Sequence, residues 1–117
     1  MRHQVKKHRL ARPKGPRKLL VGNLVTSLIL HGKIQTTKAK AKAIQPVMDK
    51  LIITAKTKDK RLAIRAVGKI LQNELSSKML FEELVKKYHD RKTGFTRISD
   101  IGFRAGDNAP LAQIELL

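Results

Sequence analysis

Cysteine and tryptophan are absent from this chain of 117 residues, which has only one tyrosine and three phenylalanines. Without cysteine the chain can form neither a disulfide nor a cysteine-based zinc site. No apolar run approaches the ~20 residues that span a membrane. The basic first eighteen residues lack both the apolar stretch of a secretory signal and the serines of a mitochondrial presequence. We therefore expect them to belong to the mature protein.

Acidic residues are missing from the first 48 positions, and the first carboxylate is Asp49. Twelve lysines and arginines lie between Arg2 and Lys42, and fourteen more accompany the nine acids of the remaining chain. The net charge of +17 therefore divides into +12 before Asp49 and +5 from there on. Repulsion between like charges at this density opposes folding into a compact body. The pattern predicts a polyanionic partner, most commonly a nucleic acid.

The first eighteen residues predict a basic tail separate from a globular domain at 19–117. Pro13 and Pro16 surround Lys14 and Gly15, a pattern that opposes a continuous helix there. Such a segment is expected to be disordered alone and to become ordered on a nucleic acid. Its lysines and arginines are the candidate contacts with that nucleic acid: Arg2, Lys6, Lys7, Arg9, Arg12, Lys14, Arg17 and Lys18.

Apolar residues recur at helical spacing in four segments, which predicts helices at about 17–31, 38–56, 60–73 and 77–89. Gly32 is the expected end of the first helix and Thr37 the expected N-cap of the second. A serine pair at 76–77 is the expected cap of the fourth. Pro46 lies inside the second helix, and the sequence leaves open whether it kinks that helix or divides it.

Three segments predict strands: a short one at 33–36, and two at 95–103 and 111–117 that are joined by turn-forming residues. The last two are expected to pair antiparallel. The predicted fold class is α+β with two layers, in the order helix, strand, three helices, two strands. A small mixed sheet would pack on the helices, and the basic tail would extend from the N-terminus.

The aromatic residues Tyr88, Phe95 and Phe103 could stack on nucleobases or fill the core. We expect all three in the core, because the chain has few aromatics and a core needs bulk. Arg97 and Arg104 are better candidates for nucleic-acid contacts. Arg97 is expected to point outward from a strand, and Arg104 begins the glycine-containing turn.

Side chains that could catalyse a reaction or bind a metal are scattered along the sequence. Asp107 and Asn108 lie in a Gly-Asp-Asn-Ala-Pro turn, where they are expected to form Asx turns. No nucleophile–base pair, phosphate-binding glycine loop or metal-ligand spacing appears. We therefore expect no enzyme, no cofactor and no metal site. The four histidines are far from acids or lie in separate elements: His3, His8, His31 and His89.

Three stretches of the sequence are recognisable: Met1-Arg2-His3, HGKIQTTKAKAKAIQPVMDKLI at 31–52, and GFTRISDIGFRAGDNAPLAQIEL at 94–116. They resemble the bacterial large-subunit ribosomal protein seventeen family. They occur in the family's order over nearly the whole chain, and the third is the most specific. The resemblance implies a structural constituent of the large ribosomal subunit that binds 23S-type ribosomal RNA and stabilises its fold.

The resemblance also implies partners, location and contact residues. The chain would be a monomer within the ribosome, beside other large-subunit proteins and away from membranes. It would be ribosome-bound in the bacterial cytoplasm, with an organellar matrix as the alternative. Residues near RNA at the start of the second helix would be Thr36, Thr37 and Lys38. Tail contacts with RNA would be Arg2, His3, Arg9, Lys14, Arg17 and Lys18.

Two other functions are compatible with the charge. A DNA-binding protein of the nucleoid would need an element that reads a groove, but neither a helix-turn-helix nor a β-ribbon arm is evident. A membrane-active amphipathic helix could lie at 17–31 beside the basic tail. That segment has few charges on its other face, so we expect it to be part of the core.

Overall fold

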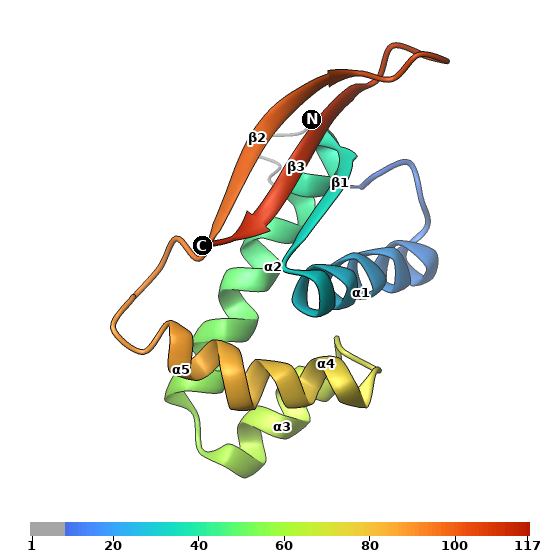
Figure 1. Ribbon diagram of the computed structural model, residues 1–117. Coiled ribbons are helices and arrows are strands. Elements are labelled where there is room, and N and C mark those ends of the chain that lie inside the picture. The colour runs from blue at the N-terminus through green and yellow to red at the C-terminus, as the bar shows by residue number, and fades with distance from the viewer. Residues whose placement is uncertain (1–8) are drawn as a thin grey trace, which may run out of the picture.

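A computed structural model describes residues 9–117, in which α1 and α2 pack against a three-stranded sheet (Figure 1). α2 continues beyond the sheet, and the remaining helices surround its far end. α4, η1 and α5 follow one another without a break and together correspond to the fourth predicted helix. The predicted α+β order of helix, strand, three helices and two strands is therefore confirmed. The elements are α1 (Lys14–His31), β1 (Lys33–Thr37), α2 (Lys38–Thr57), α3 (Lys60–Gly68), α4 (Glu74–Met79), η1 (Leu80–Leu84, a π-helical turn), α5 (Val85–Lys87), β2 (Thr96–Phe103) and β3 (Pro110–Leu116).

α1 begins at Lys14, three residues before the predicted start, although Pro16 lies in its first turn. The first backbone N–H groups of a helix have no partner within it, so a proline there removes no hydrogen bond. The first helical bond runs from Arg17 N to the carbonyl oxygen of Pro13 at 3.0 Å. Residues 14–18 of the predicted tail therefore lie in α1.

α2 is one helix from Lys38 to Thr57, with Pro46 inside it. Pro46 therefore does not divide the helix. Proline cannot donate to the carbonyl one turn earlier, at Lys42, but both residues are on the exposed side, where water can bond that carbonyl. The opposite face supplies the centre of the core through Ile44, Met48, Leu51 and Ile52, which are all buried.

The third and fourth helices differ from their predicted boundaries. α3 ends at Gly68 rather than near residue 73, and α4 begins at Glu74 rather than after a serine cap. The N-cap is Asn73, whose Oδ1 accepts hydrogen bonds from the backbone N–H of Leu75 at 2.8 Å and of Ser76 at 3.4 Å. Ser76 is buried instead, and its hydroxyl donates to the Asn73 carbonyl. Asparagine thus takes the capping position.

The sheet is antiparallel throughout, with strand order β1-β3-β2. The prediction of a mixed sheet is therefore wrong. β1 and β2 do run in the same direction, but β3 lies between them and pairs with both, so no parallel pair forms. Ala112 and Ile114 of β3 are buried on the face that packs against the helices. A bond of 2.9 Å from Leu116 N to the Gly32 carbonyl extends the pairing toward α1.

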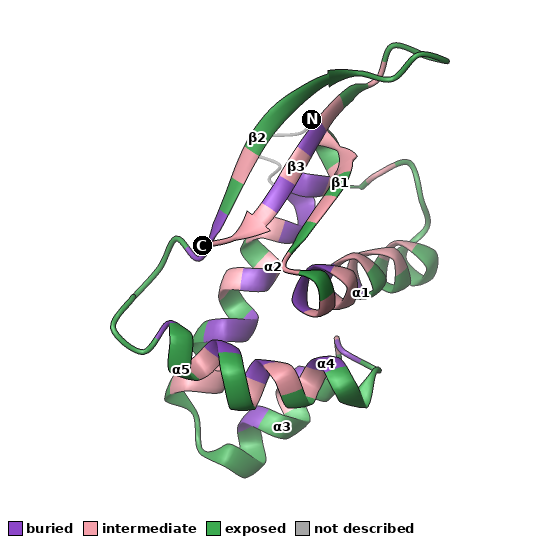
Figure 2. Ribbon diagram, in the orientation of Figure 1, coloured by how far each residue is buried: buried purple, intermediate pink, exposed green. Residues whose placement is uncertain are grey.

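The aromatic residues do not share one environment. Tyr88 and Phe95 are buried, with ring centroids 5.2 Å apart, so the core assignment is confirmed for both. Phe103 is 68% exposed, and the same prediction is wrong for it. Phe103 pairs with Pro110 at the end of the β2–β3 hairpin, which extends beyond the helices and is coloured as exposed in Figure 2. Burial of Phe103 would have required a helix beneath that end of the sheet.

Candidate nucleic-acid interface

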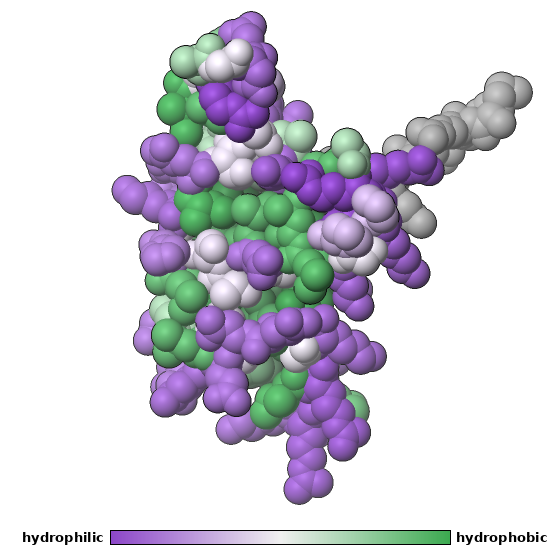
Figure 3. Space-filling model, turned by 90° about the vertical axis from the view of Figure 1, so that its right-hand side faces the viewer, coloured by the Kyte–Doolittle hydropathy of each residue, from purple (hydrophilic) through white to green (hydrophobic). Residues whose placement is uncertain are grey.

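Positive charge dominates the described surface, and few carboxylates offset it. Twenty-three of the 26 lysines and arginines lie in residues 9–117. Within that range, ion pairs involve only three of them, namely Lys38, Arg97 and Arg104. Figure 3 shows hydrophilic side chains projecting above and below a band of apolar surface on one face of the molecule. Most of the basic side chains are therefore available to an external polyanion.

The acid-free part of the sequence forms a connected region of the fold. Residues 9–48 supply α1, β1 and the first half of α2, which contact one another. In this region the only ion pair joins Lys38 Nζ to Asp100 Oδ1 of β2, at 3.3 Å. The sequence bias thus becomes a spatial bias, since these contacting parts of the fold contain no carboxylate of their own.

A turn before α1 orients two of the predicted contact residues. The backbone N–H of Arg12 donates to the Arg9 carbonyl at 3.2 Å, and Arg12 Nη1 donates to the Leu10 carbonyl at 2.8 Å. Leu10 and Ala11 have left-handed backbone angles, with φ of 53° and 54°. Both arginines are exposed. They therefore lie on the surface just before the first turn of α1.

The first two turns of α1 carry Lys14, Arg17 and Lys18 and no acid. Lys14 and Lys18 are exposed and Arg17 is half-buried. Positive charge at a helix N-terminus opposes the helix dipole, and a bound anion would relieve that conflict. The other predicted tail contacts lie outside the described residues: Arg2, His3, Lys6 and Lys7.

Thr36, Thr37 and Lys38 come together where β1 passes directly into α2. All three are half-buried, and Thr37 occupies the predicted N-cap position. Its side chain makes no capping hydrogen bond, and the first turn of α2 contains no acid. The ion pair with Asp100 already occupies Lys38. The junction can therefore offer hydroxyl and backbone N–H donors to an anion, with a partly compensated cation beside them.

Arg97 and Arg104 are exposed, as predicted, but each already has a carboxylate partner. Arg97 Nη1 lies 3.8 Å from Glu115 Oε1, on the residue opposite it in β3. Arg104 donates from Nε and Nη2 to both oxygens of Asp107, which holds the pKa of that carboxyl at about 2. The hairpin therefore attracts phosphate less than α1 does. Asp107 Oδ1 also accepts from Ala109 N, which confirms the predicted Asx turn for Asp107.

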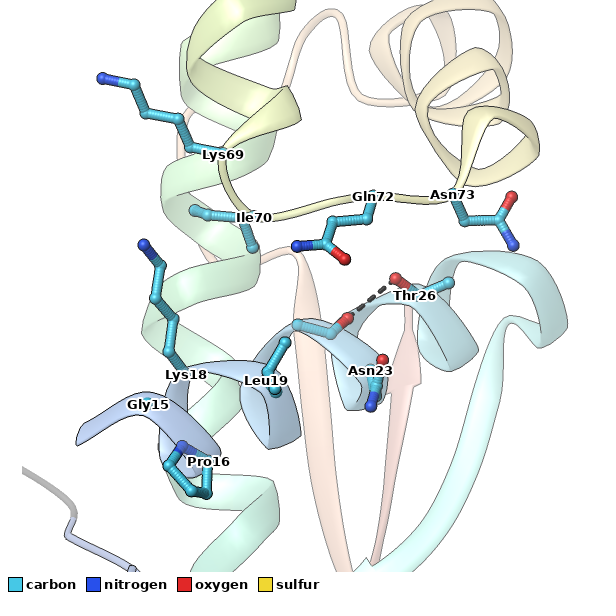
Figure 4. Close-up of a pocket in the computed structure, with 11 residues that line it drawn as sticks. Gly15, Pro16, Lys18, Leu19, Asn23, Thr26, Lys69, Ile70, Gln72 and Asn73 are labelled. Atoms are coloured by element: carbon cyan, nitrogen blue, oxygen red, sulfur yellow. Dashed lines mark hydrogen bonds between the residues drawn. The ribbon is translucent and has the colours of Figure 1, made fainter. Parts of the chain in front are cut away.

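Sequence reasoning missed a groove of about 820 Å³ between α1 and the connection from α3 to α4 (Figure 4). Lys18 and Asn23 of α1 lie on one wall, and Lys69 and Gln72 on the other. No carboxylate lines it. The walls touch at Gly22, where an added Cβ would lie only 2.9 Å from a carbonyl oxygen of the opposite wall.

The groove combines two kinds of polar group. The amines of Lys18 and Lys69 can pair with phosphates, and the carboxamides of Asn23 and Gln72 can both donate to and accept from base edges. The sequence did not reveal the turn that forms this groove, because residues 60–73 have the periodicity of one continuous helix. The helix ends at Gly68 instead, and the turn that follows carries Lys69 to the side of α1.

Other kinds of site were also considered. Within residues 9–117, no helix combines the length and the hydropathy that a membrane crossing requires. Val25, Leu28 and Ile29 of α1 are buried in the core, so this helix cannot offer them to a membrane surface. The same part of the chain brings no three histidine or acidic side chains together in a way that could hold a metal ion.

Known proteins resemble this chain over its whole length. Residues 20–117 match the family described as Ribosomal protein L17. The large ribosomal subunit protein bL17 of Neorickettsia sennetsu is 43% identical over 117 residues, which cover 100% of both chains. The bL17 proteins of Hyphomonas neptunium and Thermotoga maritima are 44% and 40% identical, over 100% of this chain and 83% and 95% of their own lengths. This chain therefore belongs to the ribosomal protein L17 family.

Proposed function

We propose that this chain is a structural constituent of the large ribosomal subunit and binds its 23S-type ribosomal RNA. The observation that carries the proposal is the acid-free first 48 residues, whose cations within the described part of the chain are almost all unpaired. The relatives are named as proteins of the large ribosomal subunit, which agrees with this function. The role is architectural, not catalytic, and its place is the ribosome in the cytoplasm.

The binding energy would come mainly from contacts with phosphates. Each lysine or arginine that meets a phosphate releases condensed counterions, so affinity falls steeply as salt rises. The basic N-terminal tail, residues 1–18, would enter the RNA, and Lys14, Arg17 and Lys18 would do so as part of α1. The groove beside Lys18 extends this surface and offers carboxamides to unpaired bases. Thr36, Thr37 and Lys38 would contact RNA at the start of α2.

The same contacts explain how the protein would stabilise folded RNA. Where RNA segments converge, their phosphates repel one another, and fixed cations between them reduce that repulsion. A monomer of this size would act between RNA segments and beside other proteins of the subunit. Arg97 and Arg104 would contribute little unless RNA displaces their carboxylate partners.

Comparing RNA with DNA tests the proposal against a nucleoid function. The affinity of the full chain for a folded 23S-type ribosomal RNA transcript and for duplex DNA would be measured at one salt concentration. We expect a preference for the ribosomal RNA, because irregular RNA presents converging phosphates and unpaired bases together. A preference for duplex DNA would favour the nucleoid function and contradict the proposal.

A further inference from the structure

The C-terminal hairpin has a different charge from the rest of the protein. Residues 93–117 contain two arginines and three carboxylates, a net charge of −1, whereas residues 1–92 carry +18. All three carboxylates are in ion pairs, with Lys38, Arg104 and Arg97. The hairpin therefore carries no excess positive charge, although the chain as a whole is strongly basic. An RNA phosphate would find no unpaired cation there.

Apolar side chains are exposed on this same segment. Phe103 is 68% exposed and Ile101 is 48% exposed. Phe103 lies opposite Pro110, and Pro110 shares a face of β3 with the buried Ala112 and Ile114. The apolar face of the sheet thus continues beyond the helices that cover it, and nothing in the described residues packs under its end (Figures 1 and 2).

The end of the hairpin is held in one shape. We call residues 101–110 the hairpin tip. Its loop is closed by a backbone bond from Arg104 N to the Ala109 carbonyl, at 2.9 Å, and by the two bonds between Arg104 and Asp107. Lys38 ties Asp100, just before the tip, to the start of α2. A rigid element that exposes an aromatic side chain loses little conformational freedom on binding.

We propose that the hairpin tip docks on another protein of the large subunit, with Phe103 and Ile101 entering an apolar pocket of that partner. The inference rests on the proposed function, since it places the partner in the same particle. Proteins that bind the same polyanion are themselves basic, and a segment with a net charge of −1 suits such a partner better than the rest of this basic chain does. An aromatic side chain that supplies most of the binding energy, among contacts that contribute little, is also typical of the centre of a protein interface.

Photocrosslinking from position 103 tests this inference directly. The full chain with Phe103→benzoylphenylalanine is expressed in cells, large subunits are purified on a gradient and then irradiated, and the adduct is identified by mass spectrometry. We expect an adduct that resists ribonuclease and joins this chain to one basic protein of the subunit. An RNA adduct, or no adduct from subunits that contain the chain, would overturn the proposal. Absence of the chain from large subunits would overturn the proposed function as well.

A second pair of variants separates protein docking from RNA binding. Phe103→Ala should leave the affinity for a naked 23S-type RNA transcript unchanged, yet reduce retention of the chain on salt-washed large subunits by about tenfold. The matched control is Ile64→Ala on α3, an apolar residue that is 50% exposed and lies outside the hairpin tip. It should change neither quantity. Equal losses of RNA affinity and retention for Phe103→Ala would show that this side chain binds RNA instead.

Discussion

Arg104 and Asp107 close the loop of the β2–β3 hairpin with two hydrogen bonds, at 2.9 Å from Nε to Oδ1 and at 2.6 Å from Nη2 to Oδ2. A planar guanidinium that meets both oxygens of a carboxylate fixes orientation as well as distance. Because Asp107 Oδ1 also accepts from Ala109 N, the same carboxylate orders both sides of the turn. The predicted RNA contact Arg104 is thereby also a structural residue of the hairpin.

This pair predicts a specific pH dependence. The hydrogen bonds from Arg104 lower the pKa of Asp107 from 3.8 to about 2. Since the folded pKa lies below the unfolded one, the contribution of the pair is complete above pH 3.8 and is lost as the pH falls through about 2. Arg104→Gln should return the Asp107 pKa toward 3.8, measured by NMR titration of the carboxyl carbon. The same titration midpoint in both proteins would show that the pair does not form in solution.

Gly22 should be intolerant of a side chain, because its added Cβ would lie 2.9 Å from the Ile70 carbonyl oxygen. Gly22→Ala would force α1 away from the α3–α4 connection, and overpacking of this kind typically destabilises by about 1–3 kcal/mol. The matched control is Gly68→Ala in the last turn of α3, where an added Cβ meets nothing within 4 Å. That change should stabilise by about 0.5 kcal/mol, because alanine favours helix.

Urea unfolding of the two alanine variants measures both effects. We expect the midpoint to fall for Gly22→Ala and to rise slightly for Gly68→Ala. If Gly22→Ala unfolded at the same urea concentration as the unchanged chain, α1 and the α3–α4 connection would not approach each other closely at Gly22. The described shape of the groove between them would then be wrong.

Two phenylalanines of opposite environment give a further test of the fold. Phe95→Ala removes a fully buried ring that packs against Tyr88, so it should destabilise by about 3–5 kcal/mol. Phe103→Ala removes an exposed ring and should change stability by less than about 0.5 kcal/mol. Thermal unfolding followed by circular dichroism compares them. Similar losses for both variants would mean that the hairpin tip folds back on the core.

Much of the fold could be predicted from local patterns in the sequence. The spacing of apolar residues located α1 and α2, and the turn residues between 105 and 110 located the β2–β3 hairpin. The N-cap of α4 was harder to predict, because Asn73 and the serine pair that follows are all good capping residues. The choice depended on Ser76, which is buried in the core, where its hydroxyl donates to the Asn73 carbonyl.

The site could be predicted less completely, because it depends on how distant segments meet. The sequence indicated which residues are basic, but not that Arg97 and Arg104 would each have a carboxylate partner. Phe103 was expected in the core because the chain has few aromatic residues and a core needs bulk, yet no described helix extends beneath its end of the sheet. The groove forms only because the chain turns after Gly68, so that Lys69 and Lys18 of α1 line the same groove.

The proposed RNA surface predicts how affinity responds to salt. Replacing Lys14, Arg17 and Lys18 by glutamine should weaken binding to 23S-type RNA and reduce the slope of log affinity against log salt by about 2–3, since each lost phosphate contact lowers it by roughly 0.7–0.9. The control replaces Lys78, Lys86 and Lys92, three exposed lysines outside the acid-free region, with the same loss of charge. Equal slopes for the two triple variants would argue against a localised interface.

Sedimentation of the tagged full chain from cell extract, through sucrose gradients at low and at high magnesium, tests the central claim most directly. A structural constituent should migrate with the large subunit under both conditions, because its contacts do not depend on association with the small subunit. A chain that stayed at the top of both gradients would contradict the account and leave its positive charge without a ribosomal partner.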